Sequence, residues 1–565
     1  MPPVATLRWT TAAGLVALTL GGSVQAVTLT LTPDQAMYKP GQTVTLTLAH
    51  ANPQQARVVT ASLRVTQLNS VVHEESRSLD LNDPAPLNFS FSAPAKGGYG
   101  AELSLSDADA PAKLLESAAT AFDVHDSWLE APRYGFLSDF FPSAANDDRV
   151  AQLARYHINA LQFYDWMYRH DQHLPPTDTF QDPLGRTLSL ETVKRRIQEA
   201  HAQGMAAMPY TTVYAASIPY FKAHPEQALR RFNGTPWNFG DNFLMTMDPS
   251  AGGGWRAHIM GEYDSILKSL DFDGLHIDQY GDPKMAQNAK GDVVQLADVI
   301  PGFLRDAKLV AEQHPGHDAV IFNLVNDWPV ETVAPAKPDA VYIEVWPPHD
   351  DYGSLRDLAY NARELSGGRN VILAAYLSAK TDYGTRLLDS VIAASGGSHL
   401  ELGEDVGLLG DPYFPKYEHP SANLKTWLGR YYDFVTRYQE YLFGAVGVTR
   451  PEALNVSGAP FTTGSYPTNK VWGLVSSGPR FEALHLINLL ASPTPTWRTA
   501  KDKPEAKRNL QVTYRTSRPV QHVFWASPDE KNAALQPLDF KLQAGKLEVT
   551  LPRLDAWSML ILEER

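Results

Sequence analysis

The chain contains no cysteine among its 565 residues. Disulfide bonds and thiolate zinc sites are therefore excluded, and the fold has to draw its stability from the size of its apolar core. Hydrophobic residues make up 44% of the sequence and charged residues 20%, as in an ordinary folded protein. The length allows roughly three or four domains, or fewer if one of them is a large barrel.

Long apolar runs and an excess of positive charge are also missing. After residue 26, no segment approaches the ~20 consecutive apolar residues that a membrane-spanning helix needs. Lys and Arg together number 49 against 63 for Asp and Glu, which gives a formal net charge of −14. This balance argues against nucleic acid or an anionic membrane surface as a partner.

Several catalytic motifs are absent as well. The sequence has no Gly-x-Ser-x-Gly turn between a strand and a helix, which disfavours a serine hydrolase. Two His-x-acid pairs, His276 with Asp278 and His399 with Glu401, have a spacing compatible with metal ligands. Without a third clustered histidine, we expect neither a metal ion nor another cofactor.

The first 26 residues have the pattern of a secretory signal. Arg8 is their only charged residue, residues 12–20 form a short apolar run, and Val24-Gln25-Ala26 resembles a cleavage site. The run is too short for the alternative, a membrane anchor. We therefore predict a signal peptide over 1–26 and a secreted or periplasmic protein.

Two regions alternate between apolar and polar residues. In "TVTLTLA" the residues Val44, Leu46 and Leu48 share one side of a strand, and turn signals separate several such segments. Period-2 alternation between turns predicts antiparallel sheets. We predict an immunoglobulin-like β-sandwich over 27–126 and a second antiparallel β-sandwich over 449–565.

The region 127–448 has a different pattern, in which short apolar runs alternate with helix-like segments. One such segment begins with the capping residue Ser189 and stops at Gly204. Eight units of this kind predict a central (β/α)₈ TIM barrel, and no glycine-rich nucleotide loop supports a doubly wound open sheet instead. The third crossover, roughly 215–272, is long enough to cover part of an active-site mouth. The eight runs are 134–140, 158–166, 204–214, 273–281, 318–326, 339–346, 369–377 and 396–404.

Four aspartates lie within "LDFDGLHIDQYGD", residues 270–282, at the fourth run. In a barrel of this type the catalytic groups lie at the C-terminal ends of the strands. Asp271 and Asp273 precede the strand and are expected to be turn or cap residues. Asp278 falls at the strand's end, where a carboxylate can point into a cleft, and Asp282 lies beyond it.

The sixth run provides a second carboxylate, Glu344, at the same height as Asp278. Two carboxylates surrounded by aromatic rings are what glycoside hydrolysis needs, because one attacks or stabilises the sugar carbon while the other protonates the leaving oxygen. The aromatic rings near strand ends can stack on sugars, although we expect about half of them to be core. These rings are Tyr164, Trp166, Tyr168, Tyr214, Tyr280, Trp346 and Tyr352.

Four segments resemble the motifs of glycoside hydrolase family 66, which contains endo-dextranases and cycloisomaltooligosaccharide glucanotransferases. The flanking sandwiches also match the domain order of that family. Several motifs in the right order make the match more specific than a single "DGxHxD" would. The segments are "LQFYDWMYRHD" (161–171), "DGLHIDQYGD" (273–282), "YIEVWPP" (342–348) and "AASGGSHLELGE" (393–404).

The resemblance implies a retaining attack on α-1,6-glucosidic linkages. Asp278 matches the nucleophile of the family and Glu344 its acid/base. His276 stands where the α-amylase clan has an arginine, which argues against starch as the substrate, and it is a polar neighbour suited to an ionised Asp278. The residues expected to bind glucose units are Tyr164, Asp165, Trp166, Tyr214, His276, Gln279, Trp346, Asp351, Glu401 and Glu404.

The leading functional prediction is an endo-dextranase that acts as a monomer on dextran, an α-1,6-glucan, and releases isomaltooligosaccharides. The cyclising glucanotransferase is the first alternative, but no crossover in this sequence has room for the extra carbohydrate-binding domain that such enzymes usually carry. A non-catalytic glucan-binding protein is the second alternative, and both carboxylates at strand ends speak against it.

Overall fold

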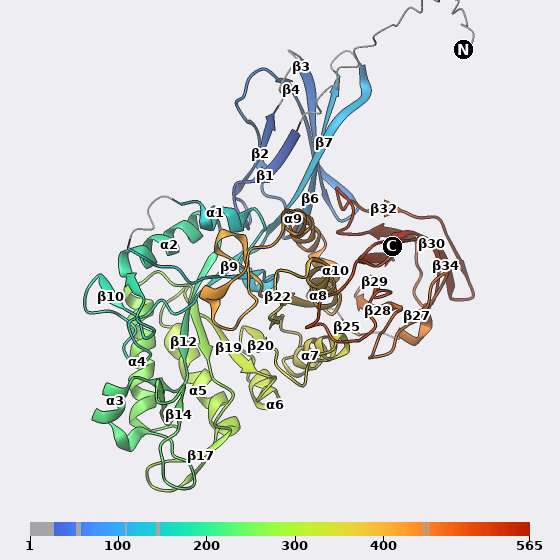
Figure 1. The fold of residues 1–565 in the computed structure, drawn as a ribbon. Helices are drawn as coiled ribbons and strands as arrows, with labels where there is room; N and C mark the ends of the chain where they lie inside the picture. Colours follow the sequence, from blue (N-terminus) through green and yellow to red (C-terminus); the bar gives the residue numbers. More distant parts are fainter. Residues whose placement is uncertain are drawn as a thin grey trace, which may run out of the picture.

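The computed structural model describes residues 28–51, 58–107, 110–142, 147–443, 447–448 and 451–564. It contains a curled central sheet with sandwich-like sheets before and after it (Figure 1). The predicted signal peptide, 1–26, lies outside the described residues. In the described part of the chain, no helix combines the length and the apolar character required to cross a bilayer.

The N-terminal domain consists of two antiparallel sheets that enclose their own apolar core. Val44, Leu46 and Leu48 are fully buried in it, as the alternation predicts. The first sheet has the order β1 (Thr28–Pro33), β2 (Thr43–Ala51), β5 (Leu87–Ser92). The second has the order β4 (Ser70–Asp80), β3 (Val58–Gln67), β6 (Gly97–Asp107), β7 (Ala110–Val124).

Eight parallel strands follow in one sheet, and each lies within one of the eight predicted runs. Nearly all of their side chains are buried, which explains the continuous apolar runs in the sequence. In spatial order they are β8 (Tyr134–Leu137), β9 (Ala160–Phe163), β12 (Ala206–Thr212), β16 (Gly274–Asp278), β19 (Ala319–Val325), β20 (Ala340–Glu344), β21 (Val371–Ala374) and β22 (Gly397–His399).

The sheet curls back on itself through the segment that follows β22. There β23 (Leu402–Gly403) pairs in parallel with β8, the first strand of the series, and in antiparallel fashion with β24 (Gly407–Leu408). Gly403 allows this contact, since a Cβ atom at its position would lie 2.3 Å from the ring of Phe136. The curl is that of a TIM-like domain.

Helices connect the parallel strands and cover the outside of the sheet (Figure 1). Ser189 caps one of them by accepting a hydrogen bond from the Thr192 N–H, as the sequence predicts. The helices are α1 (Arg149–Ala154), α2 (Leu190–Ala202), α3 (Ile218–Ala223), α4 (Gly254–Ser269), α5 (Leu296–Ala311), α6 (Val330–Val333), α7 (Tyr352–Leu365), α8 (Asp382–Ala394), α9 (Ala422–Arg437) and α10 (Gln439–Leu442).

Short hairpins extend three of the crossovers. After β12 the chain forms the small sheet β13 (Ala215–Ala216), β15 (Leu244–Thr246), β14 (Asn238–Phe239). Other crossovers carry the pair β10 (Thr179–Gln181) and β11 (Thr187–Ser189), and the pair β17 (Met285–Gln287) and β18 (Val293–Gln295).

The C-terminal domain is a second two-sheet sandwich with a core of its own. One sheet has the order β25 (Gly447–Val448), β28 (Val471–Gly478), β29 (Phe481–Asn488), β35 (Trp557–Glu563), β31 (His522–Ala526), β32 (Gln536–Pro537), with β27 (Phe461–Thr462) also pairing with β28. The other has the order β26 (Leu454–Ser457), β30 (Lys507–Arg515), β34 (Lys546–Leu554), β33 (Phe540–Gln543).

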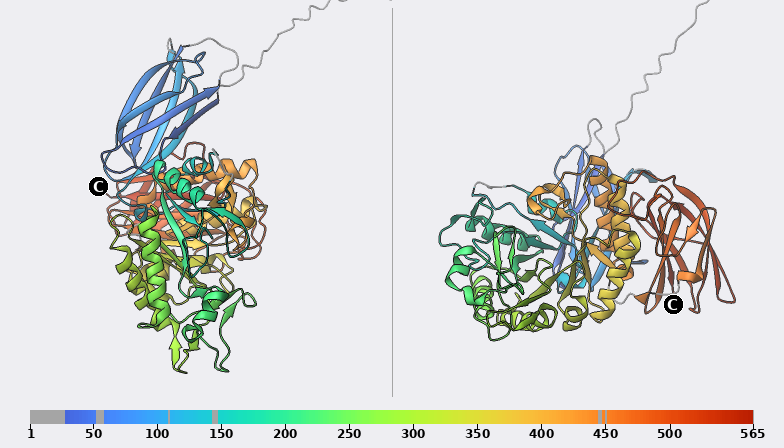
Figure 2. Two further views of the ribbon diagram at one scale, coloured as in Figure 1. Left: turned by 90° about the vertical axis from the view of Figure 1, so that its left-hand side faces the viewer. Right: turned by 60° about the horizontal axis from the view of Figure 1, so that its bottom comes forward.

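The two flanking domains lie against different sides of the central domain (Figure 2). Trp472 and Trp557 of the C-terminal domain belong to the core cluster of the central domain, and Trp557 packs 4.9 Å from Phe434 of α9. The N-terminal domain contributes the smaller buried residues Ala36 and Met37 to the central core clusters and adds polar contacts. Its Gly98 N–H donates to the Glu440 carboxylate at 2.7 Å, and its Glu102 accepts from Arg437 of α9.

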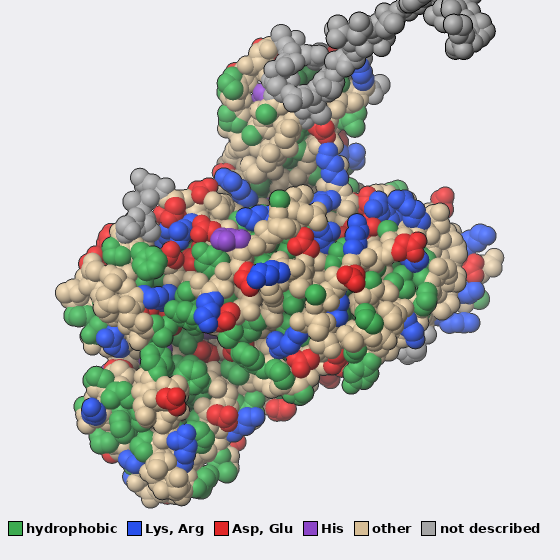
Figure 3. Space-filling model, in the orientation of Figure 1, with side chains coloured by type: hydrophobic (Ala, Val, Ile, Leu, Met, Phe, Trp, Pro, Cys, Tyr) green, Lys and Arg blue, Asp and Glu red, His purple; other side chains and the backbone are tan. Residues whose placement is uncertain are grey.

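The surface shows little segregation of charge. On the face drawn in Figure 3, acidic and basic side chains are interspersed over the central and C-terminal domains. The same face is hollowed beside the lobe that carries β14 and β17, and apolar side chains gather there (Figure 3).

Candidate active site

A cavity of about 490 Å³ opens where the parallel strands end. Asp278, the last residue of β16, and Glu344, the last residue of β20, both line it. The prediction that the two carboxylates meet at one end of the sheet agrees with this arrangement. Aromatic side chains make up much of the remaining wall, and they include Tyr164, Tyr210, Phe239, Phe243, Tyr280, Tyr342, Trp346, Tyr376, Tyr413 and Phe414.

Hydrogen-bond donors surround the carboxylate of Asp278. The Tyr210 hydroxyl donates to Oδ2 at 2.7 Å, and the Gln279 backbone N–H donates to Oδ1 at 2.8 Å. A third donor, the Asn323 amide, reaches Oδ1 at 2.6 Å. Three donors and no acceptor favour the ionised form of this carboxyl.

The carboxylate of Glu344 is held by two neighbouring side chains. The Tyr376 hydroxyl donates to Oε1 at 2.8 Å, and the Asn323 amide donates to Oε2 at 2.9 Å. The ring of Trp346, two residues further along the chain, lies 5.7 Å from the ring of Tyr376. Glu344 therefore sits among large aromatic groups that limit its contact with water.

Asn323, in the middle of β19, joins the two acids. Its Nδ2 atom donates to Asp278 Oδ1 at 2.6 Å and to Glu344 Oε2 at 2.9 Å. The two oxygens are therefore no further apart than the sum of these lengths, about 5.5 Å. One amide group fixes the spacing of the pair.

The electrostatics of the pair follow from this closeness. Burial raises the pKa of both carboxyls, and the negative charge of Glu344 raises that of Asp278 further. Two charges so close in a buried site are not both stable, so near neutral pH the pair tends to hold one proton. Three donors reach Asp278 and two reach Glu344, so hydrogen bonding stabilises a negative charge on Asp278 more and favours placing that proton on Glu344.

Five of the ten residues predicted to bind sugar line the cavity: Tyr164, Asp165, His276, Gln279 and Trp346. Tyr164 stacks on Phe414 at 4.2 Å, so the two rings form one apolar wall. Burial raises the pKa of Asp165 to about 7. Burial also lowers the pKa of His276 to about 3, which leaves this imidazole neutral beneath Asp278.

The other five lie outside the cavity wall, and each holds another part of the fold. Trp166 is fully buried and donates to the Tyr210 carbonyl, while the Tyr214 hydroxyl accepts from the Tyr280 N–H. Asp351 caps α7 by accepting from the Ser354 N–H. The remaining two are Glu401, which accepts from Tyr432, and Glu404, which accepts from the N–H and hydroxyl of Ser138 beside the β8–β23 pairing. A position near the end of a strand therefore does not by itself distinguish a residue that lines the cavity from one that holds the surrounding fold.

The other aspartates of the segment 270–282 are placed as predicted. Asp273 accepts hydrogen bonds from the Ala207 N–H at 2.6 Å and from His201 at 2.9 Å, so it ties the start of β16 to its neighbours. Asp271 and Asp282 are exposed. Asp278 is the one member of the four that lines the cavity.

The predictions from the sequence do not include three residues around the acids: Asn323, Tyr210 and Tyr376. Asn323 does carry a signal in the sequence, because a polar amide inside the apolar run "VIFNLV" needs a buried partner. Tyr210 and Tyr376 resemble core aromatics in the sequence. The predicted cover of the mouth by the third crossover is also present, since Phe239 and Phe243 line the cavity from that segment.

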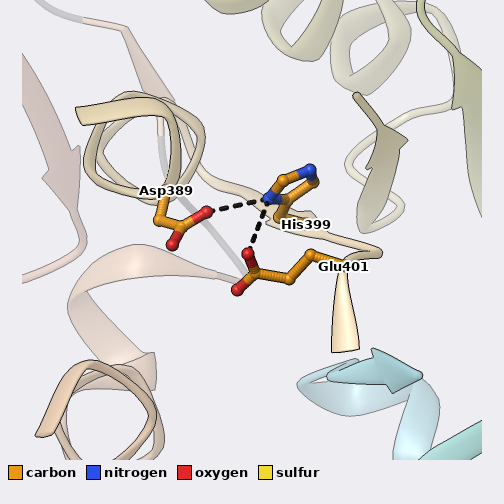
Figure 4. A group of neighbouring side chains, drawn as sticks. All are labelled: Asp389, His399 and Glu401. Carbon is orange, nitrogen blue, oxygen red and sulfur yellow. Dashed lines mark hydrogen bonds and ion pairs between the residues drawn. The ribbon is translucent and has the colours of Figure 1, made fainter. Parts of the chain in front are cut away.

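Among the described residues, one group has side chains close enough together to hold a metal ion: Asp389 of α8, His399 of β22 and Glu401 (Figure 4). His399 Nδ1 lies 2.8 Å from Asp389 and 3.6 Å from Glu401, and its Nε2 lies 2.9 Å from the Ala375 carbonyl. The 2.8 Å contact has the length of a direct hydrogen bond. Burial raises the pKa of both carboxyls, which fits a cluster that retains protons.

Known proteins resemble this chain over most of its length. A cycloisomaltooligosaccharide glucanotransferase of Niallia circulans is 25% identical over 699 residues, which cover 94% of this chain and 72% of that protein. A dextranase of Streptococcus salivarius is 23% identical and covers 83% of this chain and 67% of its own length.

A solved structure shares the fold. The crystal structure of a Paenibacillus sp. cycloisomaltooligosaccharide glucanotransferase, complexed with cycloisomaltoheptaose, superposes with a TM-score of 0.87 at 22% identity. The match covers 95% of this chain and 99% of that one. The model of Glycosyl hydrolase family 66 matches residues 33–561, in agreement with the resemblance seen in the four motifs. This protein is therefore a member of glycosyl hydrolase family 66 and an enzyme of the glycoside hydrolase type.

Proposed function

We propose that the protein is an endo-dextranase that hydrolyses α-1,6-glucosidic linkages and releases isomaltooligosaccharides. The observation that carries this proposal is the Asp278–Asn323–Glu344 arrangement, which holds two carboxylates within about 5.5 Å of each other in an aromatic cavity. A separation of roughly 5–5.5 Å is typical of retaining glycosidases, whereas inverting enzymes use roughly 6.5–9.5 Å. The pair lies at the strand ends of what we take to be a closed (β/α)₈ barrel.

In the first step, the Asp278 carboxylate attacks the anomeric carbon and the bond to the leaving glucosyl oxygen breaks. Glu344 gives its proton to that oxygen, so the released chain leaves as an alcohol. In the second step, the Glu344 carboxylate takes a proton from water, the water oxygen bonds to the anomeric carbon, and the ester to Asp278 breaks. The donors on Asp278, including Tyr210, stabilise the carboxylate that leaves in this step.

A named relative and a solved neighbour, both glucanotransferases, favour a second candidate, cyclisation. The match to the Niallia circulans enzyme runs over 699 residues and this chain has 565, so that enzyme has inserted segments that this chain lacks. In the described residues, the connections between the parallel strands contain helices and short hairpins and no further domain. This difference supports hydrolysis, because a cyclising enzyme has to bring the far end of a long glucan back to the glycosyl-enzyme.

The cellular context is also part of the proposal. The signal pattern over 1–26 supports a secreted or periplasmic enzyme. The proposal also takes the domains as 27–126, 127–448 and 449–565, and takes the enzyme as a monomer that uses no cofactor. Mass spectrometry of the exported protein should find Val27 as its first residue.

Product analysis on dextran tests the activity. Linear isomaltooligosaccharides with α configuration at the new reducing end are expected, and the Glu344→Gln variant should not release them. Cyclic products as the major species would establish the glucanotransferase instead. Products with β configuration would contradict the retaining step.

A further inference from the structure

The loop that follows Glu344 is bound to the C-terminal sandwich. This loop, residues 345–351, connects β20 to α7 and carries Trp346 in the cavity wall. Three hydrogen bonds attach its far end to the sandwich segment 495–498. The Trp497 N–H donates to the Asp350 carbonyl and its indole donates to the His349 carbonyl, both at 2.9 Å, while the Tyr352 N–H donates to the Pro495 carbonyl at 3.0 Å.

Arg498 joins the two ends of this loop. Its Nη2 donates to the Val345 carbonyl at 2.7 Å, and its Nε donates to the Asp350 carboxylate at 2.5 Å. The guanidinium also lies over the ring of Trp497, 4.1 Å from its centre, and that ring is fully buried. The planar guanidinium suits two acceptors at fixed angles, which the single ammonium of a lysine does not reproduce.

The two residues that Arg498 binds lie on either side of Trp346. Val345 is the residue directly after Glu344, and its own N–H donates to the Ala374 carbonyl of β21. The ring of Trp346 packs against Tyr376, whose hydroxyl donates to Glu344. A shift of the Val345 carbonyl therefore moves the backbone of Glu344 and the ring beside it together.

We propose that Arg498 of the C-terminal sandwich is a positioning residue for the general acid Glu344 and for the Trp346 wall. This inference rests on the proposed function, because it takes Glu344 as the proton donor. Without the Arg498 contacts, the Val345 carbonyl next to Glu344 loses its hydrogen-bond partner, while the Trp497 bonds still hold the far end of the loop. The end of the loop beside Glu344 is then less restrained, and a small displacement of a proton donor lowers the rate strongly. The sandwich thus completes the active site from outside the central domain.

A pair of arginine variants tests this proposal. Arg498→Ala removes the hydrogen bonds to Val345 and Asp350, and Arg518→Ala is the matched control. Arg518 also links a carboxylate, Glu564, to backbone carbonyls, and its side chain is 26% exposed against 24% for Arg498, but its contacts lie within the sandwich. We expect both variants to unfold at temperatures close to that of the wild type. Thermal unfolding is measured first, so that the kinetics compare folded proteins.

Two substrates separate positioning from general damage. Cleavage of dextran needs a proton on the leaving oxygen, whereas a nitrophenyl α-isomaltoside releases nitrophenolate, which is a stable anion and needs no proton. Arg498→Ala should lower kcat/KM on dextran by about ten- to a hundredfold and by no more than about threefold on the nitrophenyl substrate. Arg518→Ala should change neither, and Arg498→Lys should recover only part of the loss. Equal losses on both substrates, or equal effects of the two alanine variants, would overturn the proposal.

Hydrogen exchange gives a readout independent of activity. Amides in 345–351 should exchange faster in Arg498→Ala than in the wild type or in Arg518→Ala. Unchanged exchange would contradict the proposal that Arg498 holds this loop. If the wild type does not act on dextran, the proposed function fails, and the exchange measurement still decides whether Arg498 holds the loop.

Discussion

At the scale of single residues, Asn323 determines the relation between the two acids. Its amide nitrogen donates a hydrogen bond to each of the two carboxylates. The two acids are therefore linked by this shared donor in addition to their direct electrostatic interaction. Donation to a carboxylate stabilises its charged form and lowers its pKa. Asn323 therefore opposes the effect of burial, which raises the pKa of both groups.

Removing this amide should shift the pH dependence in a defined direction. In Asn323→Ala both carboxyls lose a donor, so both pKa values rise further. The acid limb of kcat/KM, which requires ionised Asp278, and the alkaline limb, which requires protonated Glu344, should both move to higher pH. A pH–rate profile on dextran checks this, and a profile with a lower maximum but unmoved limbs would contradict it.

The assignment of Asp278 as nucleophile can be tested by chemical rescue. Asp278→Gly should abolish dextran hydrolysis, because no glycosyl-enzyme can form. Azide should restore turnover of a nitrophenyl α-isomaltoside with inverted configuration, since the small anion fits the space of the missing carboxylate. NMR of the glycosyl azide measures this. Asp282→Asn serves as the control and should remain active, because Asp282 is exposed outside the cavity.

The residues of the site differ in how far the sequence predicts them. Asp278 and Glu344 are polar groups at the ends of apolar strands, and that position predicts their location. Glu401 and Glu404 have the same pattern, yet they are buried supports, because the chain turns into the β23 pairing directly after β22. Tyr210 and Tyr376 need the spatial order of the strands before their contacts with the acids can be seen.

At the scale of elements, the eight parallel strands and the cap of α2 follow from periodicity and capping chemistry. The short hairpins do not, since strands of two or three residues are too brief to show an alternation. The small sheet β13-β15-β14 is the functional example. Its Phe239 lines the cavity, stacks on Tyr280 at 4.6 Å, and is 48% exposed.

An exposed ring at a cavity rim should act mainly in substrate binding. Phe239→Ala should raise KM for dextran by about fivefold with little change in kcat, because an aromatic stacking contact contributes about 1 kcal/mol. Phe232→Ala is the control, since Phe232 belongs to the same crossover and is 56% exposed but does not line the cavity. Equal KM values for the two variants would show that Phe239 does not contribute to dextran binding.

At the scale of the whole molecule, the enzyme should need no metal. The Asp389–His399–Glu401 cluster ties α8 to β22 and to the end of β21 through hydrogen bonds of its own. Exhaustive chelation should therefore leave both the rate on dextran and the unfolding temperature unchanged. A loss that one divalent ion specifically restores would show that the cluster binds metal.

The shared core between the central domain and the C-terminal sandwich has a consequence for recombining this enzyme with others. Trp472 and Trp557 complete the packing around the central helices, and Arg498 reaches the loop beside Glu344. The N-terminal sandwich encloses its own core, contributes the smaller residues Ala36 and Met37 to the central clusters, and makes polar contacts with α9 and α10. Chimeric enzymes should therefore tolerate exchange of the N-terminal sandwich, while the central domain and the C-terminal sandwich have to be inherited together as one unit.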